Sequence, residues 1–280
     1  MKDTVKVQFE VGGKPMCFES GLLAQQAAGA VTCQLGDNIV FSAVTTGKPR
    51  EGCDFFPLQV EYREKFYAAG RFPGGYFKRE ARPSEKEILT SRVTDRPIRT
   101  LFPEGFYDEV QINNMLMSTD GTCYTDFLSI NASSAALLLT DLPFGGPIGG
   151  IRMGRVDGAF VINPTHDEML KSDLDLTYVG TRDKTMMIEG SADEISEADF
   201  IAAMKTAHEA IQPIIDAQFE LRKQLGLPEW KVDVVEKDTT LLDKARELAG
   251  EKLGKILEEG EKLKRQNAVN ELKDELKEQF

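Results

Sequence analysis

Residues 5–11 alternate between apolar and polar side chains. Every second position from Val5 to Val11 is apolar, the period expected of a strand with one buried face, and Gly12-Gly13 follows as a turn. The chain is therefore predicted to open with a hairpin. A second hairpin is predicted around Asp157-Gly158, because this pair accepts the positive φ angles of a type I′ turn. Strands are expected at residues 39–44, 55–62, 109–117, 151–156 and 159–163.

Two Ala- and Leu-rich segments, Leu22–Ala30 and Asn131–Leu139, are predicted to be helices that pack on the sheet. From Ser196, a plausible N-cap, apolar residues recur every three or four positions, which indicates an amphipathic helix. Pro213 is expected to kink this helix, and the turn at Gly226 to end it. Strands with interspersed helices favour an α+β fold with a mixed sheet.

A second helical stripe begins at Leu241, and the segment from there to Phe280 is highly charged with few apolar positions. Such a segment is either a solvated surface helix or a helix whose packing partners lie further along a longer chain. We favour the second interpretation. The expected domains are residues 1–230, and an all-α segment at 231–280 that belongs to a larger helical domain.

Composition and charge exclude several classes of protein and of site. The 280 residues are 41% hydrophobic and 29% charged, which is typical of a folded globular protein, and the net charge of −12 argues against coating nucleic acid with the whole surface. No apolar stretch is long enough to span a bilayer, and the N-terminus lacks a secretory signal. Four scattered cysteines and two histidines favour reduced, cytoplasmic thiols over a metal cage or a Ser-His-Asp triad.

Positive charge is concentrated in residues 62–99. This stretch has ten basic and five acidic side chains, so it carries +5 while the rest of the chain carries −17. Within it, Tyr76 and Phe77 directly precede Lys78 and Arg79. Aromatic rings stack on bases and cations pair with phosphates, so the tetrapeptide suits single-stranded RNA. The alternative interpretation is that the aromatic residues anchor the core and the cations form a solvated face.

A helix is predicted to begin after Ser84, because Ser84 and Glu87 have the spacing of a capping box. Arg92, Arg96 and Arg99 would then share one face, a candidate site for phosphate or the RNA backbone. Asp95 is expected to point elsewhere, and Pro97 is a potential break after Arg96.

Two acidic residues, Asp173 and Asp175, would lie on the same side of a strand and could hold a divalent cation. A solvated strand edge is the favoured interpretation. The segment Thr46-Gly47-Lys48 does not fit a phosphate-binding P-loop, because Pro49 follows it and the upstream glycine is missing.

Several longer segments resemble bacterial polynucleotide phosphorylases (polyribonucleotide nucleotidyltransferases). They are GRFPGGYFKREARPSE (70–85), TDRPIRTLFPEG (94–105), INASSAA (130–136), FGGPIG (144–149) and VINPT (161–165). The resemblance implies an RNase PH-like (ribosomal protein S5 domain 2-like) fold and a phosphate-dependent 3′→5′ exoribonuclease that acts in mRNA degradation. It also implies Mg²⁺, inorganic phosphate as co-substrate, and a homotrimeric ring.

In that family an aromatic-aromatic-basic-basic loop lines the RNA entrance of the ring. The loop matches Tyr76, Phe77, Lys78 and Arg79, to which we add Arg82 as a candidate RNA-binding residue.

The catalytic constellation of the family lies in a second RNase PH-like domain, as two aspartates and a lysine at fixed spacing. When Asp175 is matched to the second aspartate, Met169 and Thr177 replace the other two groups, so we expect no catalytic residue and no metal ligand here. Ser133 and Ser134 fall near the serine-rich phosphate loop but are interpreted as helix-packing residues.

The resulting hypothesis is the N-terminal part of a phosphorolytic exoribonuclease, which guides single-stranded RNA and builds the trimer while catalysis resides elsewhere. RNA-degradosome components are candidate partners. Two alternatives stay open. One is a residual active site made by the three arginines with Asp173 and Asp175; the other is a non-catalytic RNA-binding or scaffold protein, complete at 280 residues.

Overall fold

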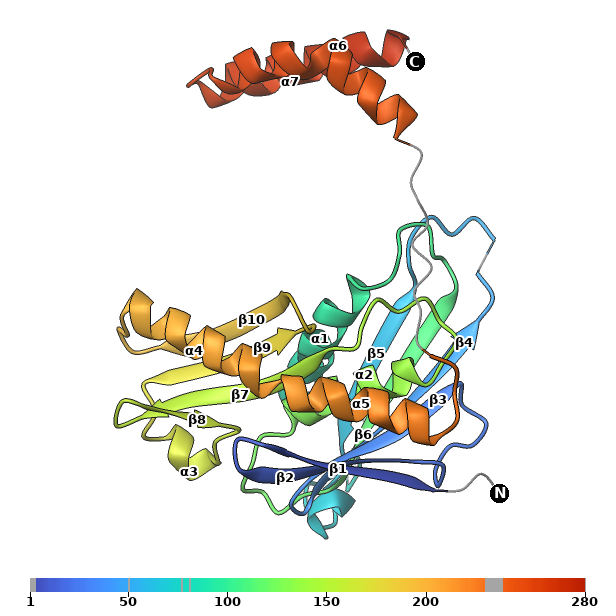
Figure 1. Ribbon diagram of the computed structural model, residues 1–280, viewed down its shortest axis with the longest axis vertical. Helices are drawn as coiled ribbons and strands as arrows, with labels where there is room; N and C mark the ends of the chain where they lie inside the picture. Colours follow the sequence, from blue (N-terminus) through green and yellow to red (C-terminus); the bar gives the residue numbers. More distant parts are fainter. Residues whose placement is uncertain (1–3, 50, 77, 81, 230–238, 280) are drawn as a thin grey trace. The chain divides into compact units, whose positions relative to one another are not determined.

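A computed structural model describes residues 4–49, 51–76, 78–80, 82–229 and 239–279 (Figure 1). The chain divides into two compact units, residues 1–233 and 234–280. None of the described helices combines the length and the apolar character that crossing a membrane requires.

A six-stranded sheet forms one layer of the first unit, with strand order β1-β2-β3-β4-β6-β5. All neighbouring strands are antiparallel except β5 and β6, which run parallel. Strand β5 therefore forms one edge of this sheet. The strands are β1 (Val5–Val11), β2 (Lys14–Ser20), β3 (Gly29–Leu35), β4 (Asn38–Gly47), β5 (Leu58–Glu64) and β6 (Glu109–Ser118).

A second, four-stranded antiparallel sheet has the order β10-β9-β7-β8. Its strands are β7 (Gly149–Val156), β8 (Ala159–Ile162), β9 (Leu174–Gly180) and β10 (Thr185–Ala192). The predicted hairpin is confirmed, because β7 and β8 pair across Asp157 and Gly158, whose φ angles are 50° and 78°.

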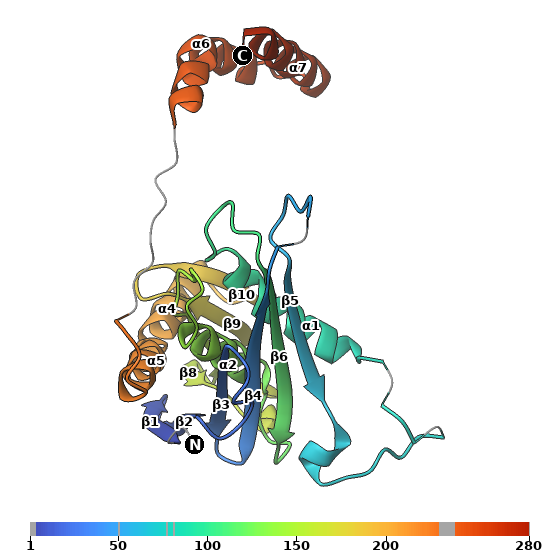
Figure 2. The same cartoon turned by 90° about the vertical axis from the view of Figure 1, so that its right-hand side faces the viewer.

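Helix α2 (Asp126–Leu138) lies between the two sheets, in contact with β3 and β4 on one side and β7 on the other (Figure 2). Four of its polar side chains, those of Ser129, Asn131, Ser133 and Ser134, are buried and hydrogen-bonded. Asn131 exchanges two hydrogen bonds with the backbone of Gly150, and Ser134 bonds Gln218 and the amide of Ile148. Ser133 donates to Asn114, so both serines pack the helix, as expected.

The other helices of this unit are η1 (Phe66–Ala69), α1 (Glu85–Arg99), α3 (His166–Met169), α4 (Glu197–Ala210) and α5 (Gln212–Gln224). Ser196 caps α4 as predicted, and Pro213 lies in the first turn of α5, where a new helix starts. Gly226, with φ of 67°, ends that helix as expected.

The helix expected at Leu22–Ala30 is wrong. Turns and bends lead instead into β3, which begins at Gly29. A Cβ atom at Gly29 would lie 2.1 Å from the carbonyl oxygen of Ala136 in α2, so close packing of strand on helix decides this segment. Tertiary contact outweighs the local helix propensity.

The second unit is a pair of helices, α6 (Thr240–Leu257) and α7 (Lys262–Gln279), that pack on each other. The Lys252 ammonium lies 2.7 Å from the Glu275 carboxylate across the pair. Of the described residues in this unit, only Ala249 and Leu272 are buried. The charged segment is thus helical, with most of its leucines exposed.

Candidate RNA-binding surface

The basic loop comprises residues 65–83. It follows the last residue of β5, contains η1 and ends just before Ser84, the N-cap of α1. It extends beyond the sheet edge formed by β5 (cyan in Figure 2). The predicted capping box is present: the Glu87 amide donates to Ser84 Oγ (3.2 Å), and the Ser84 amide donates to Glu87 Oε2 (2.6 Å). The start of α1 is therefore well defined by its own sequence.

The tip of the basic loop presents an aromatic ring beside cations. Tyr76 is 95% exposed, and Lys78, Arg79 and Arg82 are exposed. The Lys78 amide donates to the carbonyl of Gly75 (3.0 Å), a tight turn in which Lys78 has a φ of 46°. Within the described part of the chain, these three cations form no ion pair. Phe77, the other aromatic residue of the predicted motif, lies outside the described residues.

One further aromatic residue of the loop was missed by sequence reasoning. Phe72 is 92% exposed and stands between Arg71, which is also exposed, and Pro73. Exposure of a large apolar ring to water is unfavourable in free energy. Such rings are typical of surfaces that bind a ligand or a partner. Its position in a Gly- and Pro-rich segment next to an arginine was the available signal.

The three arginines of α1 have different environments. Arg92 is exposed, and its side chain has no ion pair or hydrogen bond to the described residues. Arg96 donates to Glu189 on β10 (2.6 Å). These two arginines line a shallow hollow of about 320 Å³ together with Val60, Ser91 and the acidic Asp95.

Arg99 has a structural arrangement that the sequence analysis did not foresee. Its guanidinium holds both oxygens of Asp95 (2.8 and 2.6 Å) and donates to the carbonyls of Phe56 (3.0 Å) and Leu58 (2.9 Å). The expectation that Asp95 points elsewhere is wrong, because residues four apart are neighbours on a helix. The helix also continues through Pro97 to Arg99, so the potential break after Arg96 is absent.

The acidic pair beside the second sheet is engaged by arginines. Arg155 binds Asp173 (2.6 Å) and Asp199 (2.8 Å), while Arg152 binds Asp175 (2.5 Å) and Asp126 (2.8 Å). The hydrogen bond from Arg155 lowers the pKa of Asp173. These are structural ion pairs and not a solvated strand edge.

A metal site can be tested directly on the donor groups. Nowhere in residues 4–49, 51–76, 78–80, 82–229 and 239–279 do three His, Cys, Asp or Glu side chains come together as a group that could hold a metal ion. The described residues therefore do not fit the Mg²⁺ that the resemblance implies.

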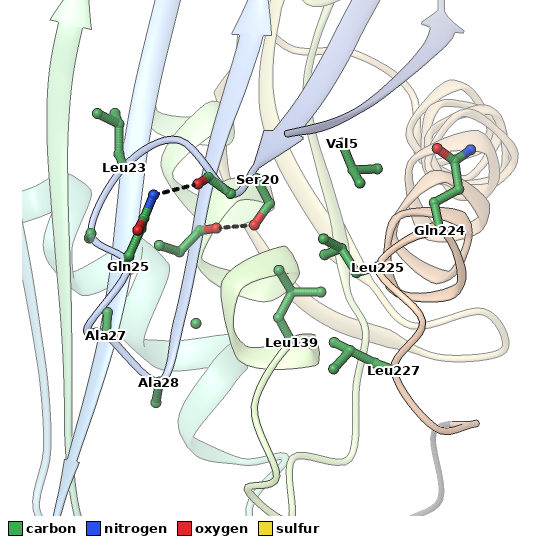
Figure 3. A pocket seen from close by; sticks show the side chains of 14 residues that line it. Val5, Ser20, Leu23, Gln25, Ala27, Ala28, Leu139, Gln224, Leu225 and Leu227 are labelled. Carbon is green, nitrogen blue, oxygen red and sulfur yellow. Dashed lines mark hydrogen bonds between the residues drawn. The ribbon is translucent and has the colours of Figure 1, made fainter. Parts of the chain in front are cut away.

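A separate hollow of about 280 Å³ lies where α2 and α5 end (Figure 3). Val5, Leu139, Leu225 and Leu227 line it, and none of its lining residues is charged. The Ser20 hydroxyl donates to the carbonyl of Ala30 (2.7 Å), so that group is satisfied internally. Because no charged side chain lines it, this hollow lacks the cations that would bind a polyanion such as RNA. The basic loop has such cations.

Two family models match consecutive parts of the chain. The model described as "3′ exoribonuclease family, domain 1" matches residues 12–143, which hold strands β2 to β6 of the first sheet, the basic loop, α1 and α2. The model described as "3′ exoribonuclease family, domain 2" matches residues 146–210, which hold the four-stranded sheet and α4.

Curated relatives match over nearly the whole chain. A polyribonucleotide nucleotidyltransferase of Methylacidiphilum infernorum is 46% identical over 99% of this chain and 39% of its own length. That of Opitutus terrae is 49% identical over 93% of this chain and 36% of its own length. The chain thus spans less than two fifths of the length of these relatives, and the resemblance seen in the sequence is confirmed.

Solved structures agree on the fold. The crystal structure of rice Rrp46 has a TM-score of 0.57 at 16% identity, covering 80% of this chain and 95% of that one. A chain of the Archaeoglobus fulgidus exosome with RNA bound to the active site has a TM-score of 0.56 at 19% identity, covering 80% and 88%. The RNase PH-like α+β fold is confirmed, and because the two family models match most of its residues, the chain belongs to the 3′ exoribonuclease family.

Proposed function

We propose that this chain guides single-stranded RNA as the N-terminal part of a phosphate-dependent 3′→5′ exoribonuclease. In this reaction inorganic phosphate attacks the terminal phosphodiester and releases a nucleoside diphosphate. The observation that carries the proposal is the tip of the basic loop, where Tyr76 is 95% exposed beside two exposed cations. An exposed ring and adjacent cations are the elements of sequence-tolerant single-strand binding.

Each residue of this surface has a definite task. Tyr76 stacks on a base, Phe72 supplies a second stacking face, and Lys78, Arg79 and Arg82 pair with phosphates. Arg92 extends the cationic surface along α1, whereas Arg96 is shared with Glu189. We assign Arg99 mainly to holding α1 on β5, because its guanidinium already has four hydrogen bonds within the protein.

The catalytic groups and Mg²⁺ of the proposed enzyme belong to a second RNase PH-like domain. We further propose that residues 1–230 form the first such domain, that residues 231–280 belong to a helical domain, and that the protein is a cytoplasmic homotrimer with RNA-degradosome components as partners. The curated relatives are more than twice as long as this chain, which supports the part of the proposal that concerns a second domain.

Charge reversal at the loop tip tests the proposal. Lys78→Glu with Arg79→Glu is expected to weaken binding of a labelled oligoadenylate. The plot of log affinity against log salt should become shallower by about 1.4, since each phosphate contact to a single strand contributes about 0.7. Fluorescence anisotropy over a salt series measures both quantities.

A matched control reverses the same amount of charge outside the basic loop, at the exposed Lys171 and Lys205. It should change the affinity less and leave the slope nearly unchanged. Equal losses in both double variants would show that overall charge and not the loop attracts RNA. Release of nucleoside diphosphates by the 280-residue chain alone would favour a residual active site in this chain.

A further inference from the structure

Both ends of the basic loop meet at one carboxylate. Glu87 Oε1 accepts the amide hydrogen of Glu64 (2.9 Å), the last residue of β5. Glu87 Oε2 accepts the amide hydrogen of Ser84 (2.6 Å), the N-cap of α1. Glu87, the third residue of the helix and a member of its capping box, thus also binds the strand from which the loop departs.

A second carboxylate ties the loop closer to its tip. Glu80 Oε1 accepts the amide hydrogen of Phe66 (2.6 Å), and the carbonyl of Glu80 accepts a hydrogen bond from the Lys65 ammonium (3.2 Å). The outgoing and returning limbs are therefore joined at two levels. The exposed residues Phe72, Tyr76, Lys78 and Arg79 lie beyond both ties.

Both carboxylate oxygens of Glu87 are needed as hydrogen-bond acceptors. The side chain is buried, with 7% of the residue exposed. Burial alone raises the pKa of Glu87, but hydrogen bonds from Ser84 and Glu64 outweigh it, and the net pKa lies below its ordinary value. An amide in place of the carboxylate can accept at only one of the two positions, which leaves one backbone N–H facing an NH₂ group.

We propose that Glu87 is a positioning residue for RNA binding: its carboxylate closes the stem of the basic loop and so holds Tyr76, Lys78 and Arg79 in place. This inference rests on the proposed function of the loop. A loop with joined ends loses less conformational freedom when RNA binds, and that saving appears as affinity.

Glu87→Gln tests the proposal through two measurements. Hydrogen exchange should become about tenfold faster or more at whichever of the Glu64 and Ser84 amides loses its acceptor, because its charge-assisted hydrogen bond to Glu87 is lost. Affinity for a labelled oligoadenylate should fall about threefold or more. Simple electrostatics predicts the opposite sign, since the variant removes a negative charge beside cations.

Glu85→Gln is the matched control, because Glu85 is exposed in the first turn of the same helix and has no part in the stem. It should leave the exchange rates unchanged and bind RNA no less tightly than the wild type. The amide of Tyr62, which donates to Ser91 Oγ (2.9 Å), serves as an internal reference for the contact between β5 and α1.

Three outcomes decide the matter. Unchanged exchange at Glu64 and Ser84 in Glu87→Gln would refute the closed stem, and faster exchange with unchanged affinity would refute its role in RNA binding. If Glu87→Gln does not fold, Glu80→Gln tests the second tie between the two limbs of the loop: exchange at the Phe66 amide should become faster and the affinity for oligoadenylate should fall, and unchanged affinity would refute the role of the joined limbs in RNA binding. If the wild-type chain binds no oligoadenylate, the proposed function fails, and a positioning role of Glu87 in RNA binding fails with it, whatever the exchange data show about the stem.

Discussion

Replacing Arg99 with lysine separates a structural role of this arginine from a role in RNA binding, because the positive charge is retained. The guanidinium makes four hydrogen bonds, two to Asp95 and two to carbonyls at the start of β5. A lysine ammonium can replace only part of this fork. The Arg99 side chain is 41% exposed, so each lost bond is worth less than a buried one.

Loss of two or three such bonds is expected to lower the free energy of unfolding by about 2 kcal/mol. For a domain of this size that corresponds to a Tm decrease of about 4–8 °C. Thermal unfolding followed by circular dichroism gives the Tm, and oligoadenylate anisotropy gives the affinity. The affinity of Arg99→Lys should stay close to that of the wild type.

Arg92→Ala is the comparison, because Arg92 has no ion pair in the described part of the structure and lies on the same helix. It should leave the Tm nearly unchanged and weaken RNA binding. The assignment of Arg99 would be refuted by a wild-type Tm in Arg99→Lys together with weakened RNA binding, since that result would identify its fork as a phosphate ligand.

Three further predictions concern packing, stacking and pH. Gly29→Ala should lower the free energy of unfolding by about 1–3 kcal/mol and the Tm by several degrees, because the new Cβ would lie 2.1 Å from the carbonyl oxygen of Ala136. An unchanged Tm would contradict this close approach. Phe72→Ala should weaken oligoadenylate binding by about 1–3 kcal/mol without lowering the Tm, as expected for loss of a base-stacking face; unchanged affinity would remove Phe72 from the RNA surface. The pKa of Glu87 is lowered in the folded state, so its stabilisation is present above the unfolded pKa of about 4.3 and is lost as pH falls through the lower folded value. The Tm difference between the wild type and Glu87→Gln should therefore shrink on acidification below about pH 4, and a constant difference would contradict an ionised Glu87.

Much of the local structure follows from the sequence. The alternation from Val5 to Val11, the turn at Asp157-Gly158 and the capping box at Ser84 each specify a backbone conformation through neighbouring residues alone, and the structure confirms all three. The concentration of charge around Tyr76 is likewise visible in the sequence. Such features depend on contacts within a few residues, which local patterns report.

Contacts between residues that are far apart in the sequence do not follow from local patterns. Glu189 meets Arg96 across 93 positions, and Glu87 joins the amide of Glu64 to that of Ser84. The sequence predicted Glu87 as the capping-box partner of Ser84 and gave no sign of its bond to Glu64. The parallel pairing of β5 with β6 brings the strand end to the helix start, and only then can one carboxylate reach both.

The sequence by itself thus determined the family resemblance, most of the strands and helices, and the aromatic and basic composition of the loop. The tertiary structure alone decided that Leu22–Ala30 is not a helix, that Arg99 is bound within the protein and that Arg92 is exposed. The physical reason is that backbone propensity and one-face burial are local properties. The neighbours of a side chain depend on which distant strand or helix packs beside it.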